Sequence, residues 1–106
     1  MMDERDYLLR MVQRLIEAVQ RLIARARKLQ LEKNDAQALV EVAEAYRELF
    51  GVDARFVHLM GAEEVRRMLG ARVQAFAEVV RLEAELRRAL GDGQRAELLD
   101  RLAQAL

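Results

Sequence analysis

The sequence lacks five residue types altogether: cysteine, proline, tryptophan, serine and threonine. Without cysteine the chain has no disulfide, no thiolate nucleophile and no zinc–thiolate site. Without serine and threonine it has neither the usual hydroxyl nucleophiles nor the phosphate-binding P-loop signature. Histidine occurs once, at position 58. We therefore expect no catalytic residue, no metal site and no cofactor, and we predict that the protein is not an enzyme.

Signals for membranes and secretion are also scarce. No apolar run approaches the roughly 20 residues that a transmembrane helix needs. The first six residues, MMDERD, are acidic, whereas a signal peptide begins with basic residues. The 18 basic and 18 acidic residues balance, so the net charge gives no general attraction to nucleic acid or to an anionic membrane. We expect a cytoplasmic protein that does not contact membranes.

What is present favours helices. Alanine, leucine, glutamate, arginine and glutamine dominate, and all five are strong helix formers. Apolar residues recur every three or four positions, and no low-complexity linker interrupts them. We therefore predict a single all-α domain over residues 1–106, a helical bundle of about five helices. The expected helices span residues 3–30, 36–50, 62–69, 71–90 and 94–106, with a short helical turn within 53–60.

The first predicted helix is the longest, and it carries a continuous apolar stripe. Its length of about 40 Å exceeds the diameter of about 30 to 35 Å expected for a compact domain of this size. An apolar stripe that extends beyond a small core needs another partner. We therefore predict a homo-oligomer, most simply a dimer, although the remaining helices of the same chain are an alternative cover. The residues expected to self-associate are Leu8, Val12, Leu15, Val19, Leu22 and Leu29.

The same helix has a basic side, which is the best nucleic-acid signal in the chain. Five positive side chains along one side of a helix are suited to contact phosphates. However, Glu17 interrupts the row, and no aromatic residues lie between the charges. Nucleic-acid binding is therefore the alternative function. Its candidate contacts are Arg10, Arg14, Arg21, Arg25 and Lys28.

Other chemical groups favour structural roles. His58 lies between apolar neighbours with no adjacent ligand or nucleophile, so we expect a partly buried structural histidine. Three glutamates share one side of the second helix, at positions 41, 44 and 48, and a solvated helix face explains them better than a cation site. By periodicity the aromatic residues should face the core. They are Tyr7, Tyr46, Phe50, Phe56 and Phe76.

Three stretches of the sequence resemble one family. The segment DYLLRMV at residues 6–12 is similar to the start of a family of small, uncharacterised bacterial helical proteins, which open with D-Y-hydrophobic-x-R on a long first helix. LFGVD at residues 49–53, followed by AEEV at 62–65 and ML at 68–69, resembles the middle of that family. The C-terminal residues 90–106 are similar to its degenerate tetratricopeptide-like hairpin. The resemblance implies a bacterial protein and a hairpin at the C-terminus, and it implies no activity.

Together these patterns predict a protein–protein interaction or scaffold module that acts through packing of helix faces. Regulatory nucleic-acid binding is the second possibility, and a sensor with an apolar pocket between helices is the third. The specific partner of such a module is not encoded in any motif of the chain.

Overall fold

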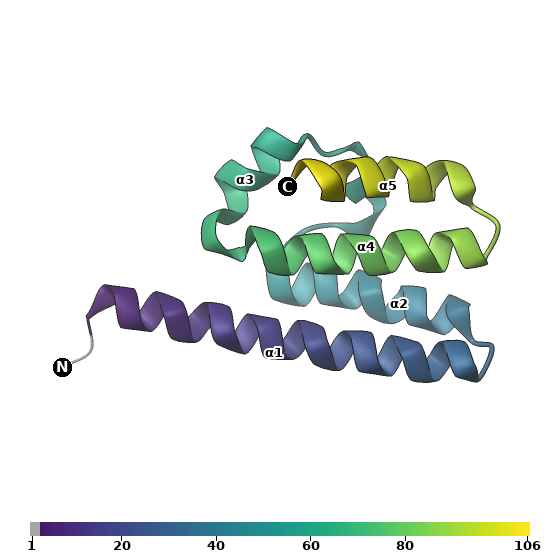
Figure 1. Cartoon of the computed structure of the whole chain (residues 1–106), viewed down its shortest axis with the longest axis horizontal. Coiled ribbons are helices and arrows are strands. Elements are labelled where there is room, and N and C mark those ends of the chain that lie inside the picture. Colours follow the sequence, from purple (N-terminus) through teal and green to yellow (C-terminus); the bar gives the residue numbers. More distant parts are fainter. Residues whose placement is uncertain (1–2) are drawn as a thin grey trace.

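The computed structural model describes residues 3–106, which form an all-α bundle with no strand in that range. Five α-helices follow one another, joined by short turns, and the C-terminal two form an antiparallel hairpin (Figure 1). The prediction of a five-helix bundle with a long first helix is confirmed. The elements are α1 (Glu4–Leu31), α2 (Asp35–Ala45), η1 (Tyr46–Phe50), η2 (Ala54–Leu59), α3 (Ala62–Leu69), η3 (Gly70–Arg72), α4 (Val73–Ala89) and α5 (Gly93–Ala105).

The helix ends follow capping chemistry that the sequence contains. Asp3 caps α1, because its side chain accepts a hydrogen bond from the backbone N–H of Asp6 at 3.0 Å. Asn34 caps α2 in the same way, accepting from the N–H of Gln37 at 3.4 Å. These interactions satisfy N–H groups that a helix start leaves without partners. They explain why the two helices begin within one residue of the predicted positions.

The second predicted helix, over residues 36–50, ends differently from the expectation. Its last five residues form a π-helical turn, η1, rather than a continuation of α2. Gly51 then takes the left-handed conformation with φ of 68°, and the N–H of Val52 donates to the carbonyl oxygen of Tyr46. The helix therefore ends at Gly51, and the chain leads into the predicted short helical turn, which is the 3₁₀-helix η2.

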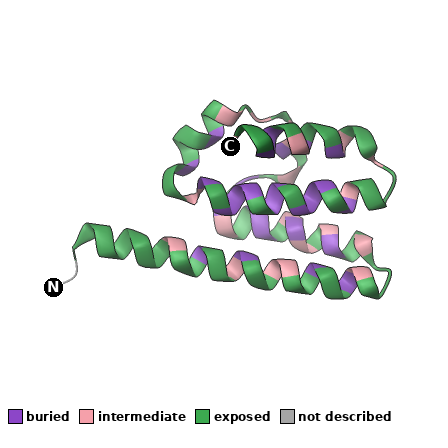
Figure 2. Cartoon of the chain, viewed as in Figure 1, coloured by how far each residue is buried: buried purple, intermediate pink, exposed green. Residues whose placement is uncertain are grey.

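Helix α4 is the centre of the bundle. It packs against α5 on one side and against α1 and α2 on the other, and buried residues cover most of its length (Figures 1 and 2). The ring of Phe76 on α4 lies 5.6 Å from that of Tyr46 and 5.2 Å from that of Phe50, measured between centroids. These three aromatic residues are buried as predicted. Tyr7 and Phe56 are 56% and 55% exposed, so the expectation that they face the core is wrong.

The molecule is elongated because α1 extends beyond the other helices. Its principal extents are 50 × 29 × 19 Å, and its radius of gyration of 14.2 Å exceeds the roughly 13 Å typical of a compact chain of this length. The first buried residue of α1 is Leu15, and the turns before it are exposed (Figure 2). We call residues Glu4–Arg14 of α1 the overhang.

No helix within residues 3–106 combines the length and the apolar character needed to cross a membrane.

Candidate interaction surface

The overhang carries apolar side chains that nothing in the chain covers. They belong to consecutive turns of α1, which leaves the bundle at this point (Figures 1 and 2). Contiguous exposed apolar surface of this kind marks interaction sites on small proteins. The exposed apolar side chains of the overhang are Tyr7, Leu8, Leu9 and Met11, with exposed fractions between 40% and 61%. Ile16, two residues after the overhang, is 46% exposed.

The structure divides the six residues predicted to self-associate into two groups. Leu15, Val19 and Leu29 are buried in the chain's own core, and Leu22 packs against that core. Leu8 is 45% exposed and Val12 is half-buried, so these two remain available to a partner. The other helices of the same chain therefore bury the C-terminal part of the apolar stripe, as the alternative prediction had it. The first turns of the stripe remain exposed.

A groove lies beside the point where the overhang leaves the bundle. Its volume is about 220 Å³, and it is open to solvent between α1 and the start of α4. Small alanine side chains from the η3–α4 region face apolar side chains of α1 across it, and polar groups contribute the rest of the lining. The lining residues are Val12, Ile16, Val19, Gln20, Ala71, Gln74, Ala75 and Glu78. Apolar surface therefore continues from the overhang into this groove through Val12 and Ile16.

The C-terminal half of α1 is held firmly to the bundle by polar contacts as well as by the core. The Arg27 guanidinium donates to the Glu85 carboxylate of α4, and Gln30 also donates to it. The hydrogen bond from Arg27 lowers the pKa of Glu85 below its ordinary value. Arg25 forms an ion pair of 3.1 Å with Glu41 of α2. One end of α1 is thus anchored in its own chain, while the other end is free.

The basic side of α1 is arranged as the sequence suggests, except at one position. Arg10, Arg14, Arg21 and Lys28 are exposed, and among residues 3–106 they have no ion-pair partner. Arg25 is the exception, because Glu41 neutralises it. The structure therefore brings four free cationic groups to the outer surface of the helix.

A buried polar cluster inside the bundle was not anticipated. Glu83 of α4 is only 1% exposed, and its carboxylate accepts hydrogen bonds from Tyr46 Oη at 2.8 Å and Arg87 Nε at 3.1 Å. Burial, and then the charge of Glu83, raise the pKa of Tyr46 well above its ordinary value. Glu83 lies four residues after Val79, on the buried side of α4. The helical spacing of the apolar residues could therefore have predicted that Glu83 is buried. A buried carboxylate needs such partners to remain charged.

His58 lies close to this cluster. It is half-buried, and its Nδ1 atom is buried without a hydrogen-bond partner, as is Nε of Arg95. Burial and then the positive charge of Arg95 lower the pKa of His58 below its ordinary value. The prediction of a partly buried histidine is confirmed. In the part of the chain that the structure describes, no group of three or more acidic or histidine side chains is placed to hold a metal ion.

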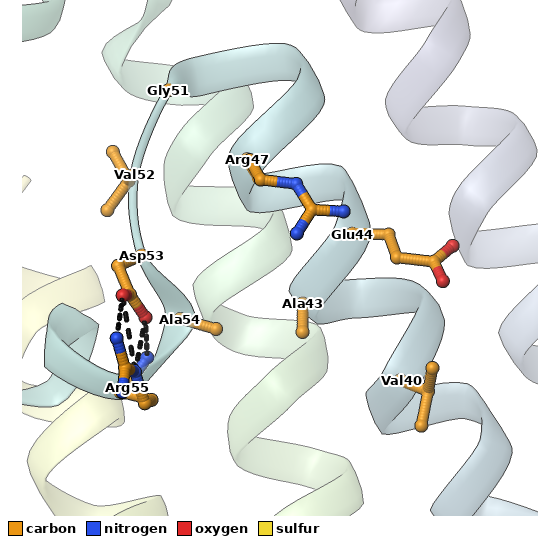
Figure 3. Close-up of a pocket in the computed structure, with 9 residues that line it drawn as sticks. All are labelled: Val40, Ala43, Glu44, Arg47, Gly51, Val52, Asp53, Ala54 and Arg55. Carbon is orange, nitrogen blue, oxygen red and sulfur yellow. Dashed lines mark hydrogen bonds and ion pairs between the residues drawn. The ribbon is translucent and has the colours of Figure 1, made fainter.

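A hollow larger than the groove lies elsewhere, between α2, η1 and the segment that follows Gly51 (Figure 3). Its volume is about 660 Å³, and its charged groups are Glu44, Arg47, Asp53 and Arg55. Asp53 and Arg55 form an ion pair of 2.7 Å with each other, which lowers the pKa of Asp53 to about 2. No ion pair joins Arg47 to Glu44 among residues 3–106, although both line the hollow (Figure 3). Asp53 and Arg55 neutralise each other at its edge.

Comparisons with protein-family models, with curated proteins and with solved structures gave no match to this chain. The likeness to a bacterial helical family thus stays a prediction from the sequence, as does the tetratricopeptide-like character of the α4–α5 hairpin.

The pKa of His58 predicts how stability depends on pH. Because the folded chain favours the neutral imidazole, protonation costs stability as the pH falls below the ordinary histidine value of about 6.5. Urea unfolding at a fixed protein concentration should therefore show the midpoint falling between about pH 7.5 and pH 5.5. Replacement His58→Gln, which removes the titrating group, should flatten this dependence. If the urea midpoint depends on pH equally in both proteins, His58 is not the group responsible.

Proposed function

We propose that this chain is a non-enzymatic protein–protein interaction module that associates with a second copy of itself through the overhang of α1. The observation that carries the proposal is the apolar stripe of α1, which remains exposed over the turns before Leu15. Burial of one such side chain contributes about 1.5 to 3 kcal/mol, so several of them together can stabilise a dimer.

The overhang also lacks stability of its own. It extends the helix by 11 residues, none of which is buried. A helix end without buried residues frays in water, because most helical stability in proteins comes from the packing of an apolar face. A partner that covers Leu8 and Met11 would therefore both remove apolar surface from water and hold these turns in helical form.

The spacing of apolar side chains favours a second copy as that partner. Leu8 and Ile16 are exposed to nearly the same extent, at 45% and 46%, and they lie four residues on either side of Val12. An apolar surface with this symmetric spacing can face itself when two copies run antiparallel about a two-fold axis. The balanced net charge of the chain adds no overall repulsion between copies.

The test is the mass of the protein in solution. Light scattering after size exclusion should give twice the 12.2 kDa of one chain at micromolar concentrations. The double variant Leu8→Glu with Met11→Glu should give the monomer mass, because a charge buried without a partner costs several kcal/mol. Both side chains are exposed in the single chain, so the helical content and the folded core should persist.

A matched control adds the same two charges on the outer side of α1. Ala24 and Leu31 are exposed, and both lie in the C-terminal part of α1, outside the overhang. The double variant Ala24→Glu with Leu31→Glu should keep the dimer mass. A monomer mass for the unmodified chain, or loss of the dimer in both double variants, would reject the overhang as the interface.

The basic side of α1 supports nucleic-acid binding as the second candidate function. Its four free cations lie away from the apolar stripe, so they would remain accessible in the dimer. Binding through them would weaken as salt rises, because each phosphate contact releases a counterion. Fluorescence anisotropy with a labelled duplex at low salt should then detect binding that the variant Arg10→Glu with Arg21→Glu abolishes. No binding at low salt would remove this candidate.

A further inference from the structure

The positions of the overhang and the groove point to one geometry for the dimer, and this inference rests on the proposed function. We propose that two copies pack antiparallel about a two-fold axis near Val12. The overhang of each copy then lies in the groove between α1 and α4 of the other. The interface would include two equivalent overhang–groove contacts, as a closed two-fold dimer requires.

The spacing of the exposed residues on α1 places the axis. Leu8 and Ile16 lie four residues before and four residues after Val12, which is about 6 Å in each direction along the helix. Both are half-exposed in the single chain, at 45% and 46%. An antiparallel pair with its axis at Val12 brings Leu8 of one copy against Ile16 of the other, so one arrangement covers both side chains.

The groove is the element that distinguishes this arrangement from a parallel one. Parallel overhangs would contact only each other, leaving Ile16 and the groove open and bringing the acidic first turns together. Antiparallel packing fills the groove and separates these like charges.

A complementary charge pair lies at the edge of this interface. Arg5 is seven residues before Val12, so the two-fold axis places it opposite residue 19 of the second copy, at the groove lined by Glu78. Arg5 is exposed and has no ion-pair partner within residues 3–106. Glu78 has a single ion pair, with Arg81 at 3.4 Å, and both of those side chains are about half exposed. Arg5 of one copy and Glu78 of the other are therefore free to interact.

Disulfide cross-linking tests the geometry cleanly, because the natural chain has no cysteine. Val12→Cys, at the axis, should form a covalent dimer under mild oxidation. Leu8→Cys alone should not, because its two copies would lie about 12 Å apart along the helices, beyond disulfide reach. An equal mixture of Leu8→Cys and Ile16→Cys should form the mixed dimer, and Ala24→Cys, exposed on the outer side, should form none.

Exchange of the edge charges gives a second measurement that requires no covalent bond. Arg5→Glu and Glu78→Arg should each raise the dissociation constant of the dimer, by about fivefold for each of the two partly exposed ion pairs that the substitution breaks. The protein that combines both changes should recover most of the original affinity. If the double variant instead loses as much affinity as the two single variants combined, Arg5 and Glu78 do not form an ion pair across the interface.

The outcomes separate this geometry from the proposed function. Efficient self-linking of Leu8→Cys, with no mixed dimer between Leu8→Cys and Ile16→Cys, would establish a parallel dimer and overturn the antiparallel one. A dimer mass with no cross-link at Val12 or between Leu8 and Ile16 would place the interface elsewhere and overturn the geometry. A monomer mass for the unmodified chain would instead reject the proposed function itself.

Discussion

The length of α4 sets how much of α1 the bundle can cover. Helix α4 has 17 residues and spans about 25 Å, whereas α1 has 28 residues and spans about 42 Å. The difference, about 16 Å, corresponds to roughly 11 residues. This equals the length of the overhang, and Leu15 is the first residue of α1 that is buried. The exposed stripe is therefore a consequence of packing a long helix on a shorter central one.

The polar interior belongs to the fold rather than to the proposed interface. Glu83 is held by Tyr46 and Arg87 within the layer formed by η1 and α4, whereas the groove is lined by other residues. Truncating one partner of a buried carboxylate leaves a charge without compensation, which is costly. The cluster thus fixes how α2 and η1 dock on α4, and it makes this part of the core sensitive to substitution.

Much of the fold could be predicted from the sequence because helix periodicity and capping are local. Asp3, Asn34 and Gly51 each act within a few residues of their own position, so their roles follow from the neighbouring sequence. The exposure of Tyr7 could not be predicted in this way, because periodicity gives the side of a helix but not whether another helix lies there. The same limit applies to the apolar stripe. Leu8 and Leu29 follow one pattern, yet Leu29 is buried in the core and Leu8 is 45% exposed.

Hydrogen exchange along α1 tests the central claim that its first turns depend on a second copy. At high protein concentration the amides of residues 8–14 should exchange slowly, and dilution to the monomer should accelerate them, because none of these residues is buried in the single chain. The amides of α4, which is buried within the chain, should remain protected at every concentration. Exchange in residues 8–14 that does not change with concentration would contradict the account.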